Sequence, residues 1–331
     1  MPSVLLLISA YNEEKIIREK IDNSLCIEYE NLQIVIASDG STDNTEKICR
    51  EFEPEIRLIH FDKNEGKNAT LNKILSNISS DIVVFTDANT MYKKNTIKKL
   101  VGGFSDPKVG CIGGHLMLTQ TKDSNTSQGE GLYWCYENML KQMESDLGEL
   151  LSTNGGIFAA RKKIIEKLEE DVPNDFQIPM NIGAKGYKVI YNSDAIAIEK
   201  TSTNFIEEMK RKIRIVNRTF TGFLKFKDSI KGLRLFELIS HKLIRWFIGI
   251  FALLLLLISI ALVNQPLYFW ILIAQIIFYF LAFVGFIFHS ESNIIYIPFY
   301  ITIIFIASTI GVLKALTGEK YKKWSPPNTS R

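Results

Sequence analysis

The sequence of 331 residues predicts an α/β fold with a doubly wound, mostly parallel sheet, followed by a C-terminal helical membrane segment. Three observations support this prediction. Short apolar runs alternate with helical patterns in the first quarter of the chain. Polar motifs directly follow three of these runs. Beyond about residue 240 the composition changes, and three long apolar runs without charged residues follow.

The first part of the chain alternates between strand and helix patterns. The apolar runs predict strands at residues 4–8, 32–37, 56–60 and 82–85, and helical spacing predicts helices at residues 13–25, 45–52 and 69–76. Such alternation is typical of a parallel sheet covered by helices on both faces. Ligands of these sheets bind beyond the carboxyl ends of the strands, so the polar residues found there are candidates for a site.

The pattern of residues 106–203 is less regular. We predict strands at residues 109–118, 157–160, 189–191 and 195–198, an amphipathic helix at 132–145, and a helix at 174–186 that ends at Gly186. Together with the first part, this region makes one predicted domain of residues 1–204.

Composition excludes several classes. The formal net charge of +3 gives no electrostatic case for a nucleic-acid partner. The four cysteines form no C-x-x-C pair and no His lies at metal-ligand spacing from them, so we expect a reducing compartment without a zinc site or disulfide framework. The first residues predict no signal peptide. The sequence contains neither G-x-G-x-x-G after the first strand nor a P-loop, which disfavours both classical nucleotide folds.

The C-terminal third predicts a membrane segment. Residues 246–263, 267–288 and 294–313 each approach the roughly 20 apolar residues that cross a bilayer. We assign residues 244–316 to three membrane helices and 317–331 to a basic tail; three buried core helices are the alternative. Basic residues flank both ends of the segment, so the positive-inside rule conflicts with three full spans. Either one run is re-entrant or interfacial, or the tail lies outside.

Residues 205–243 mix basic and apolar residues at helical spacing. This pattern predicts amphipathic helices on an anionic membrane surface, with membrane lipids as partners. A solvated helix face is the alternative for the distal lysines.

Five motifs carry candidate chemistry: Ser9-Ala10-Tyr11-Asn12-Glu13, Ser38-Asp39-Gly40-Ser41-Thr42-Asp43, Thr86-Asp87-Ala88-Asn89, Asn174-Asp175-Phe176 and Arg211-Lys212-Ile213-Arg214. At a strand end, Asp39 could accept hydrogen bonds from a base or ribose, or belong to a helix cap. Asp87 and Asn89 could share a divalent cation through their oxygens, or form an ordinary Asx turn.

The remaining candidates each have a functional and a structural interpretation. Asp175 could take a proton from an acceptor hydroxyl, or cap a helix. Arg211 and Arg214 lie one helical turn apart and could bind a diphosphate, or face the membrane. Lys67 could reach a phosphate from its glycine-containing loop, or be a solvated lysine. Trp324 could anchor the tail at the interface or form a lid over the site.

In their order, these motifs resemble family 2 glycosyltransferases with the GT-A fold, in particular the membrane-associated, polysaccharide-synthase-like branch, over roughly the whole chain. The resemblance implies that Ser9, Ala10, Tyr11, Glu13 and Asp39 bind a nucleotide sugar, with Asp87 at its diphosphate; we assign Lys67, from its loop position, to the same site. It implies that Asp87-Ala88-Asn89 matches the D-x-D metal motif, that Asp175 is the general base, and that Arg211 to Ile215 match Q-x-x-R-W, with Arg214 kept. Trp324 falls where related enzymes carry a Trp near the active site.

The chain departs from these family motifs at three places. Asn89 replaces the second acid of D-x-D, Asn174 replaces the first acid of the base motif, and Arg211 and Ile215 replace Gln and Trp. The last motif accompanies processive synthesis in the family, so processive and single transfer both stay open.

The resemblance implies an inverting transferase that uses Mn²⁺ or Mg²⁺. Its partners would be a UDP-sugar donor, a saccharide or lipid-linked acceptor, and export or synthesis proteins. It would lie in the cell (inner) membrane as a multi-pass protein with a cytoplasmic catalytic domain, and act in cell-surface or extracellular polysaccharide synthesis. A polyprenyl-phosphate glycosyltransferase and a non-catalytic nucleotide-sugar sensor or scaffold are the alternatives.

Overall fold

The computed structural model describes residues 1–119, 127–200, 205–288 and 292–321. Its strands are β1 (Val4–Ala10), β2 (Leu32–Asp39), β3 (Arg57–Phe61), β4 (Ile82–Asp87), β5 (Thr90–Tyr92), β6 (Val109–Thr119), β7 (Phe158–Arg161) and β8 (Lys188–Lys200). Its α-helices are α1 (Ile17–Leu25), α2 (Thr45–Arg50), α3 (Lys67–Asn77), α4 (Thr96–Gly102), α5 (Ser127–Asp146), α6 (Asn174–Ala184), α7 (Phe205–Phe226), α8 (Leu233–Glu237), α9 (Ile244–Ala261), α10 (Pro266–Phe288) and α11 (Asn293–Leu316). A π-helical stretch, Leu238–Leu243, joins α8 to α9, and short 3₁₀ turns lie at Gly103–Ser105, Lys162–Ile164 and Lys227–Ser229.

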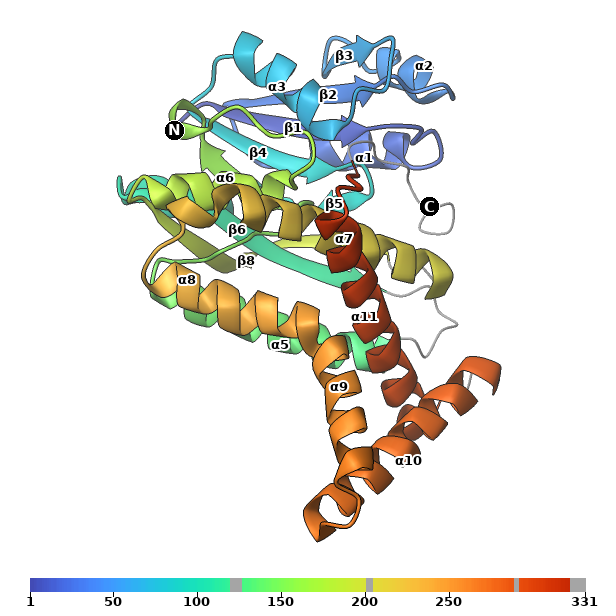
Figure 1. Ribbon diagram of the computed structural model, residues 1–331. Coiled ribbons are helices and arrows are strands. Elements are labelled where there is room, and N and C mark those ends of the chain that lie inside the picture. Colours follow the sequence, from blue (N-terminus) through green and yellow to red (C-terminus); the bar gives the residue numbers. More distant parts are fainter. Residues whose placement is uncertain (120–126, 201–204, 289–291, 322–331) are drawn as a thin grey trace.

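These strands form one sheet in the order β3-β2-β1-β4-β7-β6-β8-β5 (Figure 1). Strand β1 pairs in parallel with both β2 and β4, and β2 pairs in parallel with β3. In this register Ala10 lies opposite Ser38, and Ser9 opposite Asp87. The predicted parallel strands are confirmed, and their polar motifs meet at one edge of the sheet.

The core explains why residues 4–8 of β1 are all apolar. Leu6 and Ile8 belong to the core on one face of the sheet, and Leu5 and Leu7 to the core on the other, all at most 1% exposed. Burial of each such side chain contributes roughly 1.5–3 kcal/mol to folding. Helices therefore cover both faces, as a doubly wound sheet requires.

Beyond β4 the sheet is mixed rather than mostly parallel. Strand β7 runs antiparallel to β4 and β6, β5 runs antiparallel to β8, and β6 runs parallel to β8. Neither β5 nor α4 is predicted by the sequence pattern. The short strand β5 forms by pairing with β8, which lies far along the chain. Local sequence does not reveal such a long-range pairing.

The two strands predicted at 189–191 and 195–198 are one continuous strand, β8. Its pairing with β6 shifts register between Gly114, opposite Asn192, and His115, opposite Ile196. The Asn192 side-chain oxygen accepts a hydrogen bond from the Asp194 backbone N–H at 3.0 Å. The polar residues between the two predicted strands therefore lie in a bulge, which bends a strand without ending it.

The three apolar runs form long helices: α9 and α10 extend away from the sheet, and α11 runs back toward it beside α7 (Figure 1). Helices Leu233–Ala261, Pro266–Phe288 and Asn293–Leu316 are long and apolar enough to cross a membrane. Large apolar side chains face outward, such as Leu267, Trp270 and Phe288, which are 66%, 68% and 71% exposed. The alternative of three buried core helices is therefore wrong, and the segment fits a membrane-associated protein.

Helix α7 connects the α/β part to this segment. Its Val216 and Phe220 are buried with Trp246 of α9 and Val312 of α11. A Cβ at Gly311 would lie 2.9 Å from the Ile213 carbonyl oxygen, so α7 and α11 approach closely. The apolar face of α7 thus packs on other helices of the chain. The domain boundaries at 204, 243 and 316 stay predictions, and the second falls within one continuous helix.

Candidate active site

A cavity of about 390 Å³ lies beyond the carboxyl ends of β1, β2 and β4 and extends to α5, α6 and α7. Most of the site residues predicted from the sequence line this cavity: Ser9, Ala10, Tyr11, Asp39, Lys67, Asp87, Asn89, Asp175, Arg211 and Arg214. Two do not belong to this set. Glu13 is 2% exposed and does not line the cavity. Trp324 lies outside the described residues.

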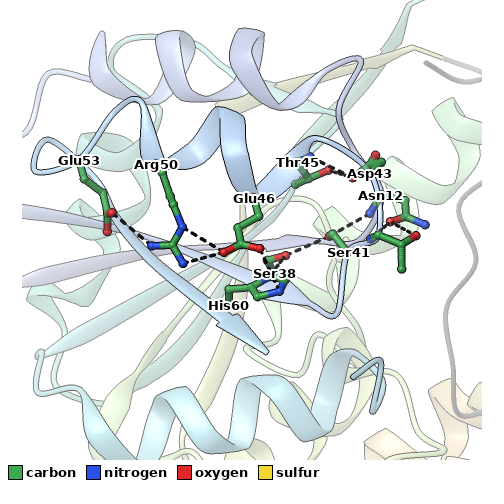
Figure 2. Close-up of polar contacts among 10 residues, drawn as sticks. Asn12, Ser38, Ser41, Asp43, Thr45, Glu46, Arg50, Glu53 and His60 are labelled. Atoms are coloured by element: carbon green, nitrogen blue, oxygen red, sulfur yellow. Dashed lines mark hydrogen bonds and ion pairs between the residues drawn. The ribbon is translucent and has the colours of Figure 1, made fainter. Parts of the chain in front are cut away.

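The loops after β1 and β2 are tied together by hydrogen bonds (Figure 2). Asn12, at a positive φ of 54°, donates its backbone N–H to Ser41 Oγ at 3.1 Å and accepts the Thr42 N–H at 2.8 Å through its side chain. The Glu13 N–H donates to Thr45 Oγ1 at 2.7 Å. Asn is among the few side chains that tolerate this backbone conformation. These contacts fix the loop after β1, from which Tyr11 lines the cavity.

A second chain of contacts supports the end of β2 (Figure 2). His60 Nδ1 lies 3.0 Å from Ser38 Oγ, and its Nε2 lies 3.3 Å from Glu46. Ser38 Oγ also donates to Ser41 Oγ at 3.0 Å. His60 therefore has a structural role beside the site.

Asp39 organises the loop before α3. One of its carboxylate oxygens accepts the Glu65 N–H at 2.9 Å and the Thr70 hydroxyl at 2.8 Å, and the other accepts the Gly66 N–H at 2.9 Å. Gly66 has a φ of 100°, which favours glycine. Asp39 thus holds the turn from which Lys67 enters the cavity, a role that sequence reasoning did not anticipate. Its predicted contact with the nucleotide stays a prediction.

The end of β4 gathers charged and polar oxygens. Lys67 Nζ lies 2.6 Å from Asp87 Oδ1. Asn89 Nδ2 donates at 3.1 Å to Glu199 of β8, a cavity residue that sequence reasoning missed. Burial raises the pKa of Glu199 to about 7; Arg211 opposes this shift and Asp87 adds to it.

A buried lysine lies beneath this turn. Lys20 of α1 is 0% exposed, donates to Thr86 Oγ1 at 3.0 Å and to the Thr90 carbonyl, and lies 4.6 Å from the centre of the Tyr92 ring. Burial lowers its pKa to about 7, although Asp87 acts in the opposite direction. Lys20 therefore braces the Asp87–Thr90 turn from within the protein.

Asp175 lies at the start of α6 and faces the cavity. Its backbone carbonyl accepts the Thr153 N–H at 2.9 Å and the Thr153 hydroxyl at 3.2 Å, which fixes the helix start. Burial raises the pKa of its carboxyl, Lys67 and Arg218 lower it, and Asp87 raises it. A carboxylate held in this way is a stronger base than one in water.

Helix α7 brings several cations to the cavity. Arg211 donates from Nε and Nη2 to the Glu208 carboxylate at 2.7 and 2.9 Å. Arg218, which was not predicted, donates to the Val172 carbonyl at 2.9 Å. No carboxylate among the described residues lies within 4.0 Å of Arg214, and burial and its neighbours Arg218 and Arg211 lower its pKa to about 10. Crowded, partly buried guanidiniums suit an anionic ligand.

The cavity also reaches the start of the first apolar helix. Lys141 of α5 donates to Asn154 Oδ1 at 2.7 Å, and Arg245 contacts Glu137 of α5. Burial lowers the pKa of Lys141 to about 8, and Asp175 is among the acids that raise it. Lys141, Lys242 and Arg245 all line the cavity, and the acid Glu137 lies among them.

Oxygen ligands are the kind that Mn²⁺ and Mg²⁺ prefer, and Asp87 and Asn89 provide them at the cavity wall. Within the residues that the structure describes, no group of three or more His, Cys, Asp or Glu forms a preassembled metal site. Asp87 and Asn89 therefore fit a metal ion that also takes ligands from a bound diphosphate.

Comparisons with known proteins agree with this architecture. The family model for Glycosyl transferase family 2 matches residues 6–169. The poly-beta-1,6-N-acetyl-D-glucosamine synthase of Staphylococcus aureus is 26% identical over 200 residues, which cover 58% of this chain and 48% of the synthase. Glycosyltransferase GlyA of Streptococcus pneumoniae is 28% identical over 203 residues, covering 57% of this chain and 29% of GlyA. The chain thus spans about half or less of these relatives.

A solved structure shows the same fold over most of the chain. The mannosyltransferase PcManGT of Pyrobaculum calidifontis, solved with GDP-Man and Mn²⁺, aligns with a TM-score of 0.74 at 21% identity. The alignment covers 96% of this chain and 88% of PcManGT. The mixed sheet is that of the GT-A fold. Residues 6–169 of the chain therefore form a glycosyl transferase family 2 domain.

Proposed function

We propose that this protein transfers a sugar, with inversion, from a nucleotide-sugar donor to a saccharide or lipid-linked acceptor, and that the donor is a UDP-sugar. One observation carries the proposal. A single cavity is lined by the strand-end residues Asp39 and Asp87, the carboxylate of Asp175, and the arginines Arg211 and Arg214. These are the groups that donor binding, proton removal and diphosphate stabilisation require.

In the proposed mechanism, Tyr11 and the β2 end bind the nucleotide. Lys67, Arg211 and Arg214 bind the diphosphate and stabilise the charge that develops on it as it leaves. Asp175 removes the proton of an acceptor hydroxyl, which attacks the anomeric carbon from the opposite side. Asp87 and Asn89 would hold the divalent cation, Mn²⁺ or Mg²⁺, which when bound neutralises diphosphate charge.

The position of the apolar helices relative to the cavity indicates where the acceptor would bind. The cavity extends to Lys242 and Arg245, in the N-terminal half of the first long apolar helix. We propose a multi-pass protein of the cell membrane, with the catalytic domain in the cytoplasm and an acceptor that arrives at the membrane surface. The names of the relatives, a poly-N-acetylglucosamine synthase and a glycosyltransferase, support a role in surface polysaccharide synthesis.

Release of UDP tests this proposal. Purified protein in detergent is given a panel of UDP-sugars and GDP-mannose, with Mn²⁺ or Mg²⁺ and, in parallel, with EDTA. Metal-dependent nucleotide release from one donor is expected and would identify that donor. If neither binding nor release occurs with any donor, the proposed activity is wrong.

A second candidate acceptor is a polyprenyl phosphate. The cations Lys141, Lys242 and Arg245 favour it, because they line the cavity where it reaches the first long apolar helix and suit a phosphate. A phosphate is already deprotonated and needs no strong base. Transfer to undecaprenyl phosphate that survives Asp175→Asn would support this acceptor, and loss of that transfer would favour a hydroxyl.

A further inference from the structure

A carboxylate from a distant strand lies beside the incomplete metal motif. In Asp87-Ala88-Asn89 an amide occupies the second acidic position of D-x-D. The Asn89 side chain donates its hydrogen bond to Glu199, which lies 110 residues away in sequence. This contact joins the motif to β8.

The sheet register explains how Glu199 reaches this position. Strand β5 runs antiparallel to β8, and Thr90 lies directly opposite Glu199. Glu199 Oε1 lies 3.1 Å from Asn89 Nδ2, and Oε2 lies 3.5 Å from Thr90 Oγ1. Both Glu199 and Asp87 line the cavity.

We propose that Glu199 is a ligand of the divalent cation, together with Asp87, and supplies the carboxylate that Asn89 does not. Divalent hard cations prefer carboxylate oxygens, and two of these neutralise the ion where an Asp–Asn pair supplies one charge. The Asn89 amide fixes the orientation of the Glu199 carboxylate through Oε1. A hydrogen-bonded partner of this kind is typical of metal-binding carboxylates.

A counter-ion for Arg211 is the alternative role of Glu199, but the hydrogen bonds of Arg211 favour another carboxylate. Glu208 accepts two hydrogen bonds from the Arg211 guanidinium. Glu199 instead accepts a hydrogen bond from Asn89 and lies 3.5 Å from the hydroxyl of Thr90. Its contacts therefore point to the metal motif.

The test measures Mn²⁺ binding rather than turnover, because the inference rests on the proposed nucleotide-sugar site. Electron paramagnetic resonance titrates Mn²⁺ into the full-length protein in detergent with saturating UDP. Glu199→Gln is expected to weaken Mn²⁺ binding about tenfold or more. UDP affinity in EDTA is expected to be unchanged, which shows that the variant is folded. Asp194→Asn, an exposed carboxylate on the same strand, is the matched control and is expected to bind Mn²⁺ normally.

Two further variants separate a ligand from a positioning residue. If Glu199 binds the ion directly, the double variant Asn89→Ala with Glu199→Gln binds Mn²⁺ more weakly than Asn89→Ala alone. Equal affinities would show that Glu199 acts only through Asn89 and would overturn the proposal. Adding Asn89→Asp to Glu199→Gln is expected to restore binding, because it returns the missing carboxylate to the motif.

UDP release by the unmodified protein is measured in the same preparations. Normal Mn²⁺ affinity in Glu199→Gln would overturn the role of Glu199 while the transferase activity stands. Absence of Mn²⁺ binding to the unmodified protein would overturn the ligand role, and absence of release would separately count against the proposed function.

Discussion

Replacing Asp175 with Asn is expected to abolish sugar transfer while leaving donor binding intact. The structure separates the two roles of this residue. Its backbone carbonyl, which Asn keeps, accepts both hydrogen bonds from Thr153. Its side chain, which Asn matches in shape, carries the charge in the cavity. A positioned general base contributes typically 10²–10⁴-fold, so the barrier is expected to rise by about 3–5 kcal/mol.

The assay compares transfer of radiolabelled sugar with donor affinity measured by calorimetry in the same detergent. Asp194→Asn makes the same chemical change at an exposed position and is expected to affect neither quantity. Equal losses of transfer and of donor affinity in Asp175→Asn would mean that the residue organises the site rather than acting as the base. Full transfer to a hydroxyl acceptor would refute the assignment.

Three further predictions concern charge and packing. Because the Lys67 charge lowers the pKa of Asp175, Lys67→Met should raise that pKa further. Since the deprotonated carboxylate is the base, the acid limb of the pH profile of kcat/KM should move to higher pH. An unmoved limb would contradict the electrostatic coupling between Lys67 and Asp175. Gly40→Ala adds a Cβ that would lie 2.4 Å from the Asn64 backbone nitrogen, at a φ of +69°. Thermal unfolding should therefore show a loss of stability above about 1 kcal/mol. Trp246→Ala should lower the free energy of unfolding by about 3–5 kcal/mol, because this side chain is buried. Trp270 faces outward, so Trp270→Ala should lower it far less. Similar losses of stability in the two variants would contradict the packing of α7 on α9.

The parallel half of the sheet could be predicted because its information is local. Each apolar run is short, is bounded by turn residues and is buried on both faces, as in β1 and β4. The carboxyl ends of such strands meet at one edge. That geometric rule alone brings Ser9 and Asp87 together, and the register of β1 with β4 confirms it.

The mixed half could not be predicted in the same way. Strand β5 has three residues, too few for a periodic pattern, and its partner β8 lies about 100 positions further on. The bulge in β8 resembles a turn in sequence, because Asn192 and Asp194 are turn-forming residues. Long-range pairing decided both features, and only the folded chain reveals it.

The sequence alone determined the fold class, the three long apolar helices and the motifs that line the cavity, because each depends on residues close together in the chain. The tertiary structure decided which side chains complete the site. Glu199 reaches Asn89 only through the β5–β8 pairing, and Arg218 enters the cavity only because α7 packs beside α6. Such contacts join elements distant in sequence, so their energy and position depend on the whole fold rather than on any local pattern.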